Sequence, residues 1–160
     1  MVLKRLDHIA FRVSDLEPVV EFYTSTLGFT IVQEMTLDFG GTKALSKVLN
    51  LPGSPFYIFV DQGLDPGNII SRWVGRYGSG LHHMAYLVDD IHKAEVSLRK
   101  AGLKFTTDTV IDTGGGLKQL FSLPNPVTGV LTEIIERYKE GVFFVQDNVI
   151  QLIKSTEGMA

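Results

Sequence analysis

The sequence predicts an α+β fold of two tandem βαβββ modules whose curved sheets enclose a metal-binding cleft. Three observations predict it: a repeated strand motif, a helical pattern after each copy, and three strand-like runs after each helix. The motif DHIAFRVSD at residues 7–15 recurs as HHMAYLVDD at residues 82–90, so that His8 matches His83 across 75 residues. The expected division is a first module at 1–64, a connecting helix at 65–79, a second module at 80–139 and a C-terminal helix at 140–160.

The elements of the first module follow in order. After the first strand, LEPVVEFYTSTLGF has apolar residues at helical spacing, with Ser14 or Asp15 as the cap and Gly28 as the stop. Three strand-like runs come next, FTIVQEMTL, KALSKVL and PFYIFV. The connecting helix is expected to begin after Asn68 and to end at Gly78.

The second module repeats this order. The segment IHKAEVSLRKAGLKF predicts a helix, and KFTTDTVI, LKQLFSL and GVLTEIIER predict three strands. Beyond them, Val149, Leu152 and Ile153 indicate a short amphipathic helix that packs back onto the body.

Composition limits the partners. The 160 residues are 44% hydrophobic and 21% charged, with a net charge of −3 and acids and bases mixed along the chain. This gives no electrostatic case for nucleic acid or a membrane surface, so a small-molecule substrate is expected. No apolar stretch is long enough to span a bilayer and no signal peptide is recognisable, which favours a cytoplasmic location. A homodimer is plausible, although no single residue indicates it.

Histidines are the first candidate ligands, because the chain has no cysteine. Alternation along the first strand places His8, Ala10 and Arg12 on the less apolar face, away from the helix. The repeat places His83 on the matching face, so the two imidazoles would converge if the modules pair about a two-fold axis. His82 is expected on the outward or helix side, and His92 in solvent.

A carboxylate should complete the ligand set. The last strand offers Glu133 and Glu136, and because they are three positions apart only one can point inward. Alternation alone does not choose between them. Imidazole and carboxylate ligands together suit Fe, Mn, Co, Ni or Zn.

The segments DHIAF, GLHHMAYLVDD and GVLTEII resemble the metal-ligand segments of the vicinal oxygen chelate superfamily. Its members include glyoxalase I, methylmalonyl-CoA epimerase, extradiol dioxygenases and 4-hydroxyphenylpyruvate dioxygenase. The resemblance implies that His8, His83 and Glu133 bind one divalent metal. A fourth ligand, present in some members, would fall near Tyr57, while Asp61 lies past the expected end of its strand.

The C-terminal segment and LKQLFS resemble the hydroxyphenylpyruvate dioxygenase type, which implies a non-haem Fe(II) dioxygenase acting on a small 2-oxo acid. In that case Gln119 is a candidate substrate contact, or else an edge-strand polar residue. Arg12 either holds a substrate carboxylate or lies in water at the sheet rim.

Two alternatives remain open. The middle of the chain equally resembles methylmalonyl-CoA epimerase, which implies an acyl-CoA epimerase with Co or Mn, for which Glu34 and Asp38 are the nearest acids of the first module. The other alternative is a non-catalytic small-molecule-binding protein, against which the His-His-Glu triad argues.

Overall fold

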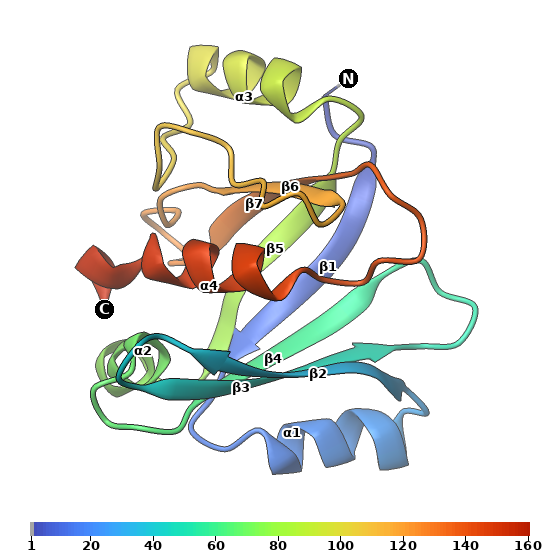
Figure 1. The fold of residues 1–160 in the computed structure, drawn as a ribbon, viewed down its shortest axis with the longest axis vertical. Coiled ribbons are helices and arrows are strands. Elements are labelled where there is room, and N and C mark those ends of the chain that lie inside the picture. The colour runs from blue at the N-terminus through green and yellow to red at the C-terminus, as the bar shows by residue number, and fades with distance from the viewer. Residues whose placement is uncertain (1) are drawn as a thin grey trace.

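Residues 2–160, which this computed structural model describes, form one curved seven-stranded sheet in the order β2-β3-β4-β1-β5-β7-β6, with helices against both of its faces (Figure 1). The strands are β1 (Arg5–Arg12), β2 (Thr30–Asp38), β3 (Lys43–Asn50), β4 (Tyr57–Gly63), β5 (Gly80–Leu87), β6 (Leu117–Phe121) and β7 (Leu131–Arg137). The helices are α1 (Glu17–Glu21), α2 (Ile69–Tyr77), α3 (Ile91–Lys100) and α4 (Gln146–Lys154). The predicted α+β class is therefore confirmed.

β1 and β5, which carry the two copies of the repeated motif, lie side by side at the centre of the sheet (Figure 1). They pair antiparallel, with His8 opposite Ala85 and Ala10 opposite His83. A two-fold axis between the strands exchanges these two pairs. β4 pairs parallel with the outer side of β1, and β7 pairs parallel with the outer side of β5. The two copies therefore present equivalent residues to a common central point.

The two faces of the sheet belong to different layers. On the convex face, Ile134 packs among buried residues of the α3 cluster, and Ile58 packs in the α1 cluster. Their sequence neighbours Glu133 and Phe59 point to the concave face, because successive side chains of a strand alternate. The candidate site lies on this concave face.

α4 covers the concave face (Figure 1). Its Val149 and Ile153 join Ala10, Phe59 and Ala85 of the sheet in one buried apolar cluster. Burying an aliphatic or aromatic side chain of this size stabilises the fold by about 1.5–3 kcal/mol. The amphipathic pattern of the C-terminal segment thus fastens α4 over the centre of the sheet.

The segment at residues 104–111, expected as a strand, differs from the prediction. It makes only isolated bridges, from Phe105 to Ser122 and from Ile111 to Gln119. Within it, the Thr107 hydroxyl bonds locally and donates to the Thr109 carbonyl at 2.8 Å. Such local side-chain hydrogen bonds compete with a regular ladder.

Helix ends follow the expected signals in part. At the start of α1 the N-cap is Leu16, without a capping side chain, and not Ser14 or Asp15 as expected, although Asp15 accepts from the Glu17 amide at 3.1 Å. Asn68 caps α2 by accepting a hydrogen bond from the Ile70 amide at 3.0 Å. α1 is only five residues long and continues as a π-helical turn, Phe22–Thr26. Gly28 then ends this segment with a φ of 81°, a left-handed conformation that favours glycine.

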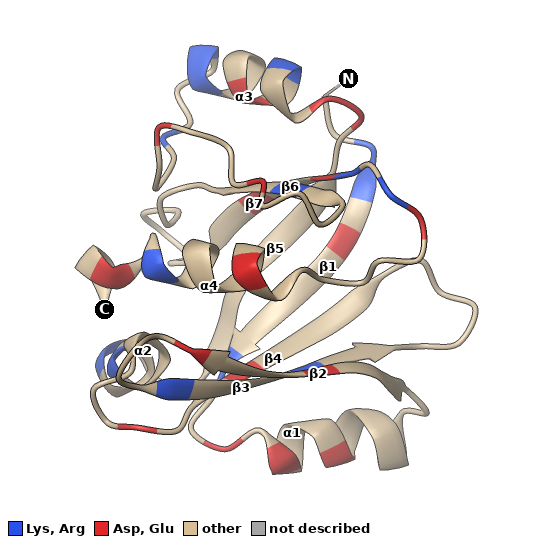
Figure 2. Cartoon of the chain, in the orientation of Figure 1, with Lys and Arg blue, Asp and Glu red and all other residues tan. Residues whose placement is uncertain are grey.

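Charged residues are spread over the fold. Figure 2 shows both signs interspersed, with α3 carrying both, and the part of the sheet behind α4 largely without charge. Within residues 2–160, no helix combines the length and apolar character needed to cross a bilayer.

Candidate metal centre

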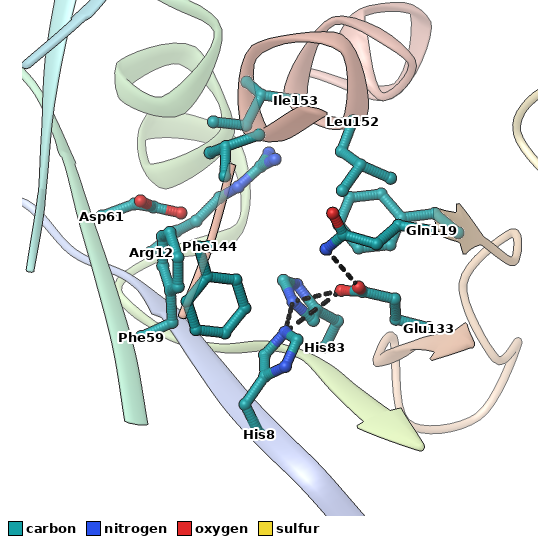
Figure 3. Close-up of a pocket in the computed structure, with 12 residues that line it drawn as sticks. His8, Arg12, Phe59, Asp61, His83, Gln119, Glu133, Phe144, Leu152 and Ile153 are labelled. Carbon is teal, nitrogen blue, oxygen red and sulfur yellow. Dashed lines mark hydrogen bonds and ion pairs between the residues drawn. The ribbon is translucent and has the colours of Figure 1, made fainter. Parts of the chain in front are cut away.

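Three buried side chains from three different strands converge beneath α4 (Figure 3). Nε2 of His8 on β1 lies 3.2 Å from Nε2 of His83 on β5 and 3.2 Å from Oε2 of Glu133 on β7. The remaining edge of the triangle, from His83 Nε2 to Glu133 Oε2, is 3.0 Å. The three residues are 2%, 6% and 1% exposed, so water does not separate them. This arrangement could hold a metal ion.

The size of the triangle suits three ligand atoms of one metal ion, with edges between the octahedral and tetrahedral spacings. Two ligands at about 2.1 Å from a metal lie about 3.0 Å apart when they are at right angles, and about 3.4 Å apart in a tetrahedron. The edges here, from His8 and His83 to Glu133, are 3.2 and 3.0 Å. Two imidazoles and a carboxylate suit several divalent transition metals, and the donor set does not identify which one.

His8 is oriented by a carboxylate. Its Nδ1 lies 2.8 Å from Oδ2 of Asp7, which is fully buried. Asp7 is in turn held by the guanidinium of Arg137 through bonds of 2.8 and 3.0 Å. A proton on Nδ1 that is donated to Asp7 leaves the Nε2 lone pair of His8 facing the centre.

His83 is oriented by another histidine. Nδ1 of His82 lies 2.8 Å from Nδ1 of His83, and His82 is 1% exposed with its ring against Trp73 of α2. If His83 is to present a lone pair at Nε2, its Nδ1 must donate a proton to His82. His82 was expected on the outward or helix side. Its ring faces α2, as one of these alternatives predicts, and it is buried because α2 covers it.

Glu133 is oriented by an amide. Nε2 of Gln119 on β6 donates to Oε1 of Glu133 at 2.8 Å, and Oε1 of Gln119 accepts from Nδ2 of Asn148 at 3.0 Å. Gln119 lies on the edge strand β6, but its side chain is 1% exposed and lines the pocket. Its contact to Glu133 leaves the other carboxylate oxygen free to face the histidines.

In the metal-free protein at neutral pH, His8 carries an additional proton. Burial disfavours a charged His8, but the charge of Glu133 and hydrogen bonds to Asp7 and Glu133 outweigh it and raise the pKa of His8 to about 9. Burial lowers the pKa of His83 to about 4, although Glu133 opposes this. Burial would raise the pKa of Glu133, but the charges and hydrogen bonds of the two histidines hold it far below its usual range. A cation at this point, proton or metal, balances the buried carboxylate.

The position equivalent to Glu133 in the first half is Phe59, not Tyr57 as the sequence analysis expected. Ala85 of β5 is opposite Glu133 of β7, and its counterpart Ala10 of β1 is opposite Phe59 of β4. Tyr57 lies one step away along that face, with its ring against the Phe144 ring at a centroid distance of 5.9 Å. Of these two equivalent strands, only β7 supplies a ligand, and the described residues of the centre offer three donors, His8, His83 and Glu133.

A pocket opens above the triad toward α4 (Figure 3). The space between its atoms, part of which is open to solvent, is about 310 Å³. Its walls combine the triad and Gln119 with apolar side chains and one pair of opposite charges. They are Phe59, Phe121, Phe144, Val149, Leu152, Ile153, Arg12 and Asp61. The pocket suits a small molecule.

Arg12 lies on the pocket side of β1, as alternation predicted, and is 2% exposed rather than solvated at the rim. Asp61, expected past the end of its strand, is inside β4 and 4% exposed. It lies two residues after Phe59 on the same face, so a β4 drawn slightly longer would have found it.

The other acids considered from the sequence lie elsewhere. Glu34 and Asp38 are exposed on β2, and Glu34 forms an ion pair with Lys47 at 3.4 Å. Glu136 faces α3, where it accepts from the Ile91 amide at 2.8 Å. The strand pattern left open whether Glu133 or Glu136 points inward. Glu133 does so, and Glu136 points to α3.

The fold and the triad are those of a metal-binding class of βαβββ proteins, and comparison with known proteins identifies the family. The chain belongs to the Glyoxalase/Bleomycin resistance protein/Dioxygenase superfamily, whose model matches residues 5–134. This confirms the resemblance to the vicinal oxygen chelate superfamily.

Among individual relatives, mitochondrial methylmalonyl-CoA epimerase of Homo sapiens is 28% identical over 132 residues, covering 82% of this chain and 73% of that protein. The crystal structure of methylmalonyl-CoA epimerase from Mycobacterium tuberculosis superposes with a TM-score of 0.72 at 27% identity, covering 87% and 91% of the two chains. A 4-hydroxyphenylpyruvate dioxygenase of Legionella pneumophila is 27% identical over 106 residues, which are 64% of this chain and 30% of that protein. The comparisons thus favour an epimerase over the dioxygenase that the sequence analysis put first.

Proposed function

We propose that the chain is a metal-dependent epimerase that moves the proton next to the carbonyl of a short acyl thioester of the methylmalonyl-CoA type. One observation carries this proposal: a buried carboxyl group, Asp61, lines the same pocket as the convergent donors of His8, His83 and Glu133. Proton transfer at carbon needs both an electrophilic centre and a base beside it. The epimerases among the relatives support the substrate class.

The metal at the triad and the side chain of Asp61 have separate roles in the proposed reaction. A divalent metal at the triad would polarise the thioester carbonyl and make the adjacent carbon more acidic. Asp61 would accept the proton from that carbon. The protonated Asp61 would then give a proton back to the same carbon after the flattened substrate has turned its opposite face toward it. Burial raises the pKa of Asp61 to about 6, although a hydrogen bond from Ser46 and the charge of Arg12 oppose the rise. At neutral pH this carboxyl is ionised but remains a better base than a solvated one.

The surroundings support the same chemistry. Gln119 holds Glu133 in its orientation through the 2.8 Å bond, and Phe144, Leu152 and Ile153 exclude water from the reacting carbon. A dry pocket strengthens the electrostatic interactions within it.

The test is proton exchange. Metal-loaded protein in heavy water should introduce deuterium into methylmalonyl-CoA, as followed by mass spectrometry. Asp61→Asn should slow the exchange by about 10²- to 10⁴-fold, because it removes the base, and should leave metal affinity unchanged. Glu133→Gln should abolish metal binding and exchange together, whereas Glu136→Gln, on the same strand but facing α3, should change neither.

A second candidate is an oxygen-dependent enzyme acting on a 2-oxo acid, and Phe59 is the observation that favours it. With an apolar side chain at the position equivalent to Glu133, three ligand positions stay free for a chelating acid and a co-substrate. Anaerobically prepared protein with Fe(II) and an aryl pyruvate would then consume oxygen. Oxygen uptake without deuterium exchange would replace the epimerase with this candidate, and the absence of both would reject both.

A further inference from the structure

Arg12 is a buried positive charge in the wall of the pocket, and it forms no hydrogen bond with the triad among the described residues. It follows His8 by four residues on the same face of β1, so its Cα lies about 13 Å further along the strand. Figure 3 shows its guanidinium group between Asp61 and the α4 residues Leu152 and Ile153, with the triad at the other end of the pocket. The two ends therefore offer separate sites for one ligand.

Most of the hydrogen-bonding capacity of this guanidinium is unused. Nη2 donates to the hydroxyl of Thr156 at 3.2 Å, but Nε and Nη1 have no partner anywhere in residues 2–160. The Cζ atom lies 4.9 Å from the centroid of the Trp73 ring, which stabilises the charge without accepting those protons. Leaving buried charged donors unpaired is costly, so a site of this kind is typically completed by a ligand.

Asp61 does not complete it. It lines the same pocket, yet within the described part of the chain it forms no ion pair with Arg12. Its carboxylate instead accepts a short hydrogen bond from the Ser46 hydroxyl. The remaining attraction is too weak to offset burial: burial lowers the pKa of Arg12 to about 10 despite Asp61, and raises that of Asp61 despite Arg12. Within the described residues, the guanidinium thus has no negatively charged acceptor in direct contact.

We infer that Arg12 binds a carboxylate of the substrate remote from the metal, and that the pocket selects short dicarboxylic acids or their monothioesters. Nε and Nη1 keep their N–H groups free, and Nη2 uses only one of its two hydrogens for Thr156. Each edge of the planar group that can give a carboxylate two parallel hydrogen bonds combines Nη2 with one of these free atoms. A phosphate group, with about two negative charges, would be repelled more strongly by Asp61. This inference rests on the proposed function, in which the triad would hold the carbonyl through its metal and Asp61, beside Arg12, faces the carbon between the two ends.

The walls between the two polar ends support a short apolar spacer. Phe59, Phe144 and Leu152 line this stretch and offer no hydrogen-bonding side-chain group. A ligand with a charge at each end and a few carbons between matches this order of polar, apolar and polar surfaces.

The experiment measures binding rather than turnover. Calorimetric titrations of the Co(II)-loaded protein compare malonate, succinate and glutarate with monocarboxylates of equal length. The dicarboxylate of best length should bind at least about tenfold more tightly than its monocarboxylate. Arg12→Gln should weaken that dicarboxylate by about tenfold to a hundredfold while leaving Co(II) affinity unchanged.

Arg76→Gln is the matched control, since Arg76 is exposed on α2 and its loss changes the net charge equally. If Arg12→Gln does not fold, the double variant Arg12→Gln/Asp61→Asn, which removes both buried charges together, takes its place. Equal binding of dicarboxylates and monocarboxylates by the unmodified protein, or a preference that survives the loss of Arg12, would overturn the inference.

Titration of the metal-free protein separates this inference from the proposed function. A carboxylate that still binds there in an Arg12-dependent way would support the Arg12 site even if deuterium exchange is absent. Deuterium exchange that is unaffected by Arg12→Gln at saturating and at limiting substrate would leave the epimerase standing without the Arg12 site.

Discussion

At the scale of single residues, each donor of the triad has a partner that sets its protonation. Asp7 contacts His8, His82 contacts His83 and Gln119 contacts Glu133, each at 2.8 Å. The partners differ in charge, one being a carboxylate and two being neutral groups. Burial lowers the pKa of both histidines, which are equivalent by the repeat. In His8 the charge of Glu133 and the hydrogen bonds to Asp7 and Glu133 outweigh burial, whereas in His83 the contribution of Glu133 does not.

The raised pKa of His8 predicts how the metal-free protein responds to pH. Because the pKa in the folded state is about 9 and the ordinary value is 6.5, the charged His8 stabilises the fold fully below about pH 6.5. This stabilisation is lost as the pH rises through 9. In the presence of a chelator, the free energy of unfolding should fall by about 3 kcal/mol between pH 6.5 and 9.5, as measured by urea denaturation.

His8→Gln is the comparison for this prediction, because glutamine cannot titrate in that range. The variant should show a flat profile from pH 6.5 to 9.5. Identical slopes for the two proteins would mean that the proton resides elsewhere. Saturation with metal should also remove the slope, since a bound cation replaces the proton.

At the scale of elements, α4 is fastened to the sheet through Asn148, which is fully buried. Its Nδ2 donates to the Leu117 carbonyl at 2.9 Å and to Oε1 of Gln119 at 3.0 Å. Its Oδ1 accepts from the amide and hydroxyl of Thr113 at 3.1 and 2.6 Å. One side chain thereby links the covering helix, the strand β6 and the support of Glu133.

Asn148→Ala should therefore destabilise the protein. The substitution leaves several buried polar groups without partners, and we expect a loss of about 3 kcal/mol in the free energy of unfolding, measured by urea denaturation. Gln151→Ala, at an exposed position of the same helix, should change stability by less than about 0.5 kcal/mol. Similar losses in both variants would show that helix propensity, and not the Asn148 network, fastens α4.

At the scale of the whole molecule, the two halves are equivalent in backbone but not in ligands. The central pairing of β1 with β5 brings His8 and His83 together, while the outer strands supply Glu133 from one half and Phe59 from the other. Because of this asymmetry, the side of the centre at Phe59 is apolar. The rings of Phe59 and Phe144 pack there with their centroids 4.9 Å apart.

Restoring the symmetry should add a ligand. Phe59→Glu places a carboxylate at the position equivalent to Glu133, and we expect Co(II) affinity to rise by about tenfold or more, with a changed visible spectrum. Phe59→Leu, which stays apolar, should keep the original spectrum and affinity. A spectrum of the Glu variant that matches the Leu variant would show that residue 59 does not reach the metal.

The sequence by itself determined the α+β class, the repeated strands and the convergence of His8 with His83. These follow from local periodicity and from a repeat whose two copies pair about an axis. It also predicted a C-terminal helix that packs back onto the body, because Val149, Leu152 and Ile153 recur at helical spacing. Local pattern was sufficient for the class and the helix, whereas the convergence of the two histidines also requires that the two copies of the repeat pair about an axis.

Only the tertiary structure decided which side chains meet across strands. Strand register put Phe59 rather than Tyr57 opposite Ala10 and brought Asp61 into the pocket, and a register cannot be derived from one strand alone. The burial of His82 depends on α2 closing over it with Trp73, and the open donors of Arg12 depend on everything that surrounds it. Contacts between distant segments form through packing in three dimensions, and no periodicity within either segment encodes them.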